Sequence, residues 1–396
     1  SVTGSTVTPG TITANGNPTA STDSPFDDPE GFKFGEEGDQ NIIKCGSYKG
    51  SGTNGDKVYV GFEPQWVMLK RTDSTSNWVM LDVMRGIPGT NQNDDQALDA
   101  DQSGSEYNNV SIMGITPTGW KWQHPYMNAS GGSYVYIAIR RPDGYVSKLP
   151  EAGTDVFAMD VGSGSSGIPS WDSGFPVDMA INTQPASTQN KYIGARLTGT
   201  SGLETNSTAA PTAYSNWTWD SNIGWNKGSA GSDWQSWMWK RGVGFDVVTY
   251  ESPGGNNFAV SHSLGKIPEM MWIKRRSSSG SNWTVYHKGL NGGTNPEQYG
   301  LHLNSTSAEV DDYGFFADIA PNATTFQVGY DGTTGSSGES YLAMLFASVD
   351  GISKVGYYNG TGYAGHVITT GFTPRLLIIK KINGANSWFL FDSLRG

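Results

Sequence analysis

Apolar and aromatic residues in this chain gather into short runs, with no long amphipathic stripes. Three near-continuous apolar runs of about six residues occupy 134–139, 234–239 and 341–346, each after a Gly/Ser-rich turn. Such runs are typical of strands buried on both faces. No window of 12 or more residues shows a helical period. The pattern predicts an all-β chain, and short strands at intervals of 8–12 residues favour β-sandwiches.

A second pattern repeats along the chain. Three segments place a Lys six residues after a Pro, and a Trp fourteen or fifteen residues after the same Pro. The copies are Pro64, Lys70 and Trp78; Pro268, Lys274 and Trp283; and Pro374, Lys380 and Trp388. A degenerate copy begins at Pro176. Because the three Trp residues recur in register, we expect them to lie in cores.

The repeats predict tandem modules of about 100 residues, too long for a solenoid unit. We divide the chain into a Ser/Thr/Gly/Pro-rich arm with an acidic lead-in at 1–40, modules at 41–144, 145–244 (degenerate) and 245–351, and the first half of a fourth at 352–396. The acidic stretch at 27–39 favours a solvated charge run over a cation site. A half module leaves an apolar face in water, so we expect further chain or another subunit to cover it.

Two Asp–Arg pairs accompany the repeat. Asp82 and Arg85 in the first copy, and Asp392 and Arg395 in the last, are each three residues apart. We predict that they hold turns through charge-assisted hydrogen bonds. A catalytic role is less favoured, because neither pair has a base or nucleophile beside it in the sequence.

Composition limits the classes of partner that the protein can be expected to bind. The 396 residues include 26 basic and 37 acidic side chains, for a net charge of −11, and no Lys/Arg run. Nucleic acid is therefore not an expected partner, because phosphate binding needs clustered cations. No apolar run reaches the 18–20 residues of a membrane span. Cys45 is the only cysteine, which excludes an intrachain disulfide and a cysteine zinc site.

Signatures of catalysis are scarce. The five histidines show neither HxH nor HExxH spacing, and no phosphate loop or GxSxG elbow occurs. Carboxylate pairs such as Asp94 and Asp95 do not recur between modules. We therefore expect no enzyme activity, no metal and no cofactor. A polysaccharide-degrading enzyme is the alternative, because paired carboxylates can serve a glycosidase.

Aromatic residues outside the repeated positions offer a binding hypothesis. Aromatic faces stack on sugar rings, although burial in a core is the default for Trp. The candidate glycan-binding residues are Trp120, Trp122, Tyr126, Trp217, Trp219 and Trp225.

The repeated strings also resemble a known module. The segment from Gly371 to Lys380, the segment from Trp388 to Gly396, and the line from Gly61 to Gly86 are similar to a module of marine bacteriophage tail-fibre and other virion proteins. This resemblance implies a lectin-like, jelly-roll or concanavalin-like β-sandwich in a virion protein assembled in the host cytoplasm. It carries over no catalytic or binding residue.

Resemblance and composition together set the expected role. We expect a tail-fibre or appendage component that adheres to a host-surface polysaccharide, forms a homo-oligomer and contacts other virion subunits. The alternatives are a virion-associated polysaccharide-degrading enzyme and a purely structural capsid-decorating or filament-forming subunit.

Overall fold

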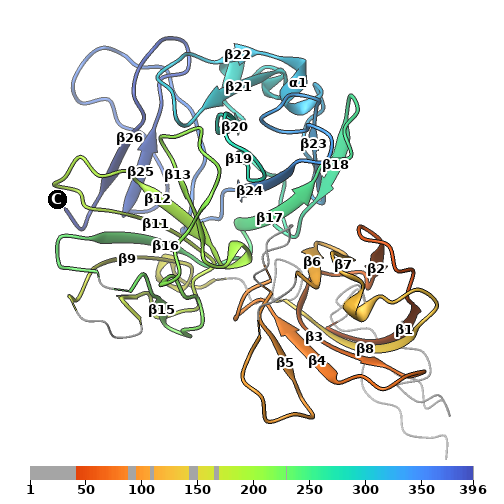
Figure 1. The fold of residues 1–396 in the computed structure, drawn as a ribbon. Helices are drawn as coiled ribbons and strands as arrows, with labels where there is room; N and C mark the ends of the chain where they lie inside the picture. Colours follow the sequence, from red (N-terminus) through yellow and green to blue (C-terminus); the bar gives the residue numbers. More distant parts are fainter. Residues whose placement is uncertain are drawn as a thin grey trace, which may run out of the picture.

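The computed structural model describes residues 42–87, 95–107, 111–141, 150–164, 169–228 and 230–395. The predicted arm at 1–40, with its acidic stretch, lies outside these residues, as does Asp94. The fold is all-β, as the sequence predicts (Figure 1).

Module 1 is a two-sheet sandwich. Its large sheet has the order β1-β8-β3-β4-β5 and its small sheet the order β2-β7-β6. Trp120 of the small sheet meets Tyr136 of the large sheet edge to face, with ring centroids 5.2 Å apart. The strands are β1 (Ile43–Lys49), β2 (Lys57–Tyr59), β3 (Pro64–Arg71), β4 (Trp78–Asp82), β5 (Ala97–Asp99), β6 (Met113–Thr116), β7 (Gly119–Trp122) and β8 (Ser133–Arg140).

Module 2 repeats this arrangement. Its large sheet has the order β14-β13-β12-β11-β16-β9, and β10 pairs with β15 in a small sheet. The last strand of the module therefore lies between the first and the third, as in module 1. The strands are β9 (Phe157–Val161), β10 (Trp171–Asp172), β11 (Met179–Thr183), β12 (Tyr192–Ala195), β13 (Ser201–Glu204), β14 (Thr212–Ala213), β15 (Gly224–Trp225) and β16 (Gln235–Trp239).

Module 3 has the same order again, β17-β24-β19-β20-β21-β22, with β18 paired to β23. Its strands are β17 (Phe245–Glu251), β18 (Phe258–Ser261), β19 (Met270–Arg275), β20 (Thr284–His287), β21 (Tyr299–His302), β22 (Val310–Asp311), β23 (Thr325–Val328) and β24 (Ser340–Phe346). A one-turn helix, α1 (Tyr313–Phe316), lies between β22 and β23.

The three long apolar runs form β8, β16 and β24. Each of these strands is second from one edge of its large sheet, next to the first strand of its module. Beyond residue 351, the described residues contain one hairpin, formed by β25 (Leu376–Ile379) and β26 (Phe389–Asp392). By their place in the repeat, β25 and β26 correspond to the third and fourth strands of a module. We call residues 352–395 module 4.

Modules 2 and 3 each have two apolar layers. One face of each large sheet packs on the module's own small sheet, as Met271 and Ile273 do on Val260 and Phe326 in module 3. The opposite faces of these sheets form a shared layer with β25–β26, within an apolar cluster that also contains the sandwich core of module 1. We call this shared layer the hub. Its members include Ile181, Ile193 and Trp237 from module 2, Trp272, Val285 and Met344 from module 3, and Leu376, Ile378 and Leu390 from module 4. Figure 1 shows modules 2, 3 and 4 grouped together and module 1 to one side.

Buried charges join module 1 to the other modules. Arg241, two residues past β16, donates two hydrogen bonds to Glu63 of module 1, at 2.6 and 2.7 Å, and a third to Asp246 of β17, at 2.8 Å. Arg141, the residue after β8, lies 3.2 Å from Glu63 and 3.3 Å from Asp246. All four side chains are buried. We call these residues the junction cluster.

Electrostatics favour the ionised forms of Arg241 and Asp246 in the junction cluster. Burial alone opposes ionisation, but the opposing charges outweigh it: Glu63 and Asp246 raise the pKa of Arg241, and Arg241 and Arg141 lower the pKa of Asp246. Backbone N–H groups of Val247 and Ser263 also donate to Asp246. The cluster is thus both paired and hydrogen-bonded, the condition under which buried charges persist.

Removing one charge from the junction cluster should destabilise the protein strongly. In Glu63→Gln the buried Arg241 loses its bidentate partner, which should lower the free energy of unfolding by about 3–5 kcal/mol. Arg71→Gln breaks the solvent-accessible pair between Arg71 and Asp73. This control should change the free energy of unfolding by less than about 1 kcal/mol. Urea unfolding of both variants makes the comparison. Equal unfolding midpoints would contradict the role of the cluster.

His287 should make stability depend on pH. Its Nδ1 accepts a hydrogen bond from the N–H of Gly289 at 2.9 Å. Burial, and secondly the charge of Lys288, lower its pKa to about 4, whereas an unfolded histidine titrates near 6.5. Because the folded pKa is the lower one, this contribution is present above pH ~6.5. It should be lost as the pH falls towards 4, by up to about 3 kcal/mol.

Unfolding at pH 7 and pH 4.5 tests this dependence. His287→Asn keeps an acceptor for Gly289 but cannot titrate, so it should lose less stability between the two pH values than the wild type. The same substitution at the exposed His366 is the control and should leave the difference unchanged.

Candidate functional site

Five of the six aromatic side chains predicted to bind sugar lie inside sandwiches. Trp120 and Trp122 belong to the core of module 1. Trp217, Trp219 and Trp225 belong to the core of module 2, where Trp219 stacks on Trp225 with centroids 4.8 Å apart. Their faces are covered by protein, so the glycan-binding prediction is wrong for these five. The competing interpretation, burial in a core, is correct.

Tyr126 differs from the other five. It lies on a short 3-10 helix, Pro125–Met127, and its side chain is exposed. A single exposed ring gives a sugar one stacking surface and no enclosing pocket. Its role in binding stays a prediction.

Both Asp–Arg pairs are present at turns. The Nε of Arg85 and the Nε of Arg395 each lie 2.6 Å from Oδ2 of their Asp, and the backbone N–H of each Arg donates to the Oδ1 of the same Asp. Arg395 also lies over the ring of Trp237, 5.5 Å from its centroid. The last pair thus reaches from module 4 onto module 2.

The recurring Trp residues differ in exposure. Trp283 is fully buried, Trp388 is half-buried, and Trp78 is 37% exposed. The core prediction is therefore correct for Trp283 and wrong for Trp78. The reason is that the position faces a neighbouring module and lies outside its own sandwich core.

The recurring Lys residues explain the nearly constant spacing between Lys and Trp in the repeat. Lys70, Lys274 and Lys380 each donate from Nζ to the carbonyl of the residue two positions before the Trp: Ser76, Ser281 and Asn386. The ammonium group therefore fixes the backbone that presents the indole. We call each Lys with its Trp a Lys–Trp motif.

Two Lys–Trp motifs dock one module on the preceding one. The Nε1 of Trp283 donates to the carbonyl of Glu204 in module 2 at 2.9 Å, and that of Trp388 donates to the carbonyl of His302 in module 3 at 3.1 Å. Glu204 and His302 hold the same position, since each ends the fifth strand of its module. The motif is a joint between modules, and the sequence revealed its spacing but not this role.

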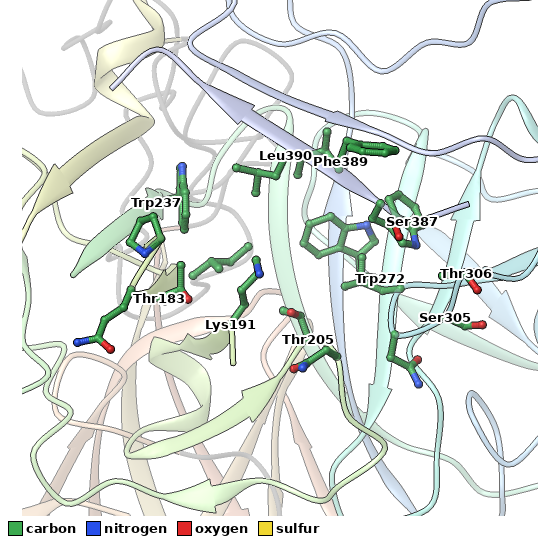
Figure 2. Close-up of a pocket in the computed structure, with 18 of the residues that line it drawn as sticks. Thr183, Lys191, Thr205, Trp237, Trp272, Ser305, Thr306, Ser387, Phe389 and Leu390 are labelled. Carbon is green, nitrogen blue, oxygen red and sulfur yellow. The ribbon is translucent and has the colours of Figure 1, made fainter. Parts of the chain in front are cut away.

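A cavity of about 380 Å³ opens where modules 2, 3 and 4 meet (Figure 2). Ile181, Trp272 and Ile378 line it. By strand register these are the same position of the third strand in each module. The cavity is therefore created by the repeat, where three equivalent sheet faces converge without closing.

Polar groups also face this cavity. In Figure 2, Lys191 lies between the rings of Trp237 and Trp272. These two rings are fully buried, and among the described residues their indole N–H groups have no hydrogen-bond partner and are closed to a ligand. The remaining polar lining is amides and hydroxyls, with Arg395 at one side: Thr183, Gln184, Ser187, Thr205, Asn206, Asn304, Ser305, Thr306 and Ser387.

This lining suits a polyhydroxylated ligand. The half-buried ring of Trp388 and the exposed ring of Phe389 can cover the apolar face of a sugar, and the amides and hydroxyls of the lining can hydrogen-bond to its hydroxyl groups. The volume lies within the range of small-molecule sites. The lining contains no carboxylate pair, so it holds no general acid and base for glycoside hydrolysis.

Within the described ranges, no group of three or more His, Cys, Asp or Glu side chains could hold a metal ion. None of the helices in these ranges is long and apolar enough to cross a membrane.

Comparison with protein families identifies the chain. A family model described as a domain of unknown function (DUF7483) matches residues 38–141 and 181–396, about four fifths of the chain. The chain belongs to the DUF7483 family. The two matched stretches of this DUF7483 protein contain all three Lys–Trp motifs. No curated protein and no solved structure matches it.

Sequence reasoning missed the cavity because its residues belong to three modules. Lys191, Trp272 and Ser387 are far apart in the chain and share no motif. One signal was available: Trp272, Ile378 and their counterparts recur in the third strand but on the face opposite the sandwich core. An apolar residue on both faces of a strand indicates a second contact surface.

The exposed ring of Phe389 should matter for binding. Phe389→Ala removes an aromatic face that lines the cavity, and should weaken sugar binding roughly tenfold, a loss of about 1.4 kcal/mol. Phe391→Ala is the matched control, because Phe391 is an exposed aromatic residue of the same strand that does not line the cavity. Calorimetric titration of both variants with the bound sugar measures the difference. Equal losses would exclude the cavity as the site.

Proposed function

We propose that this DUF7483 protein is a bacteriophage virion structural protein, a tail-fibre or appendage component that adheres to a host-surface polysaccharide through the cavity between modules 2, 3 and 4. The proposal rests on the resemblance of the repeated strings to a virion module and on the character of that cavity.

The observation that carries the structural part is how the modules are joined. Domains linked by flexible segments move independently, whereas here buried ion pairs and a common apolar layer tie successive modules together. Such joints resist bending between modules. That property suits a component that transmits force between a particle and a surface.

The adhesive part rests on the cavity's donors and rings. The half-buried Trp388 and the exposed Phe389 supply the accessible aromatic surface, the amides and hydroxyls of the lining supply donors and acceptors, and Lys191 adds a cation at the mouth. An acidic or hydroxyl-rich surface polysaccharide fits this set better than an apolar ligand does. Binding without turnover is the expected behaviour, since the lining lacks a carboxylate pair.

A glycan array probed with the full chain tests adhesion, followed by the variant Lys191→Ala. Lys191 is exposed, so its removal should leave folding intact and weaken binding of an acidic glycan about tenfold. Lys57→Ala, at an exposed position of module 1, is the charge-matched control and should bind like the wild type.

The array and a turnover assay also separate the alternatives. Sustained release of reducing ends from host polysaccharide would replace the proposal with a degrading enzyme. An array without hits, together with particles that are stable only when the protein is present, would reduce the function to a structural subunit without adhesion.

A further inference from the structure

The outer face of the large sheet in module 1 is apolar and open to solvent. The side chains of one face of this sheet include Ile43, Trp66, Met68, Trp78, Met80, Leu98, Ile137 and Ile139, and none of them is buried. The opposite face, with Val67 and Leu69, is fully buried in the sandwich. An apolar face of this size on a soluble module indicates a contact surface.

The other modules show what covers the equivalent face. By strand register, Met68 corresponds to Ile181 and Trp272, both buried in the hub. Cys45, on the same open face, corresponds to Met159 and Val247, which are also buried in the hub. In both modules the covering surface is the same face of another module. Among the described residues, the open face of module 1 is thus the one complete copy of this surface that no module covers; module 2 meets it at one edge, where Asp220 lines a hollow with Trp66 and Ile139.

The Lys–Trp motif of module 1 is folded like the one that docks module 3. The N–H of Trp78 donates to Asp101 Oδ1 at 3.0 Å, and the N–H of Trp283 donates to Asn304 Oδ1 at 2.9 Å. The acceptor side matches too. The carbonyls of Asp99 and His302 each accept the N–H three residues later, at 3.2 and 3.3 Å.

Neither half of this joint is used by another module in the part of the chain that the structure describes. The indole of Trp78 is solvent-exposed, because no module docks there. Module 2 carries Lys191 where module 3 carries Trp283, so the next module offers no indole to the Asp99 carbonyl. Module 1 therefore presents a matched donor and acceptor on one surface.

We propose that module 1 joins three copies of this chain into a cyclic trimer, in which the indole N–H of Trp78 in each copy donates to the Asp99 carbonyl of the next. A head-to-tail contact that uses a donor and an acceptor on one surface closes into a ring when the rotation fits. The hub indicates that the ring has three copies, because three equivalent modules meet in the hub. This assembly is independent of sugar binding.

Sedimentation equilibrium or native mass spectrometry of the full chain tests the proposal. At micromolar concentration the expected mass is about three times the 42.5 kDa of one chain. A monomer or a dimer at tens of micromolar would overturn it.

Two variants separate the interface from general instability. Trp78→Glu places a carboxylate in the contact at an already exposed position, and should weaken the trimer by roughly 30-fold or more, as loss of a central aromatic anchor does. Tyr59→Glu, at a 70% exposed aromatic position on the small sheet of the same module, is the matched control and should remain trimeric. A trimer unchanged by Trp78→Glu would place the interface elsewhere.

Cys45 gives an independent readout, because it is the only thiol and lies on the same face. In the wild-type trimer, maleimide should label it slowly, as expected for a residue equivalent to the buried Met159. In Trp78→Glu the labelling rate should rise at least severalfold, without loss of thermal stability. Equal rates in the two proteins would contradict the proposal.

Discussion

The arrangement of modules depends on four charges that are removed from water together. Glu63, Arg141, Arg241 and Asp246 come from module 1, the ends of modules 1 and 2, and the first strand of module 3. Buried carboxylates and guanidinium groups are tolerated only in close pairs with well-placed hydrogen bonds. The geometry of the pairs therefore restricts how the chain passes from one sandwich to the next. An apolar junction of equal size would permit sliding, because hydrophobic contact has little directional preference.

The hub shows a second use of one sheet. In modules 2 and 3 the large sheet buries both faces, one against its own small sheet and one against other modules. This double burial explains why every residue of β16, and every residue of β24 except the last, is buried. In module 1 only one face is buried, and β8 alternates between buried residues and residues that are half-buried or exposed. The burial pattern of this strand thus reflects whether one or both faces of its sheet are covered.

The sequence predicted the class of fold well because that class is written in local patterns. The apolar runs of β8, β16 and β24 and the Gly-rich turns before them are local features, and the Asp–Arg turns involve residues three apart. Prediction failed where the environment of a residue is set by a distant segment. In the sequence, Trp120 and Trp225 could be solvent-exposed side chains that bind a ligand, because nothing local shows which strands cover them. Trp78 and Trp283 occupy the same register, yet of these two only the indole of Trp283 reaches a carbonyl of another module among the described residues. The cavity was beyond reach for the same reason, since three modules contribute its walls.

The degenerate second module has a consequence for the chain as a whole. At the position where module 3 carries Trp283, it carries Lys191, a residue that cannot serve as an indole anchor. A string of four identical units would stack each unit on its predecessor and bury every docking surface inside one molecule. Loss of one anchor interrupts that series after the first unit, so the string divides into a closed cluster and one outward-facing member. Degeneration of a repeat, usually regarded as decay, here breaks the equivalence of the units and separates the part that consolidates the molecule from the part left open to the outside.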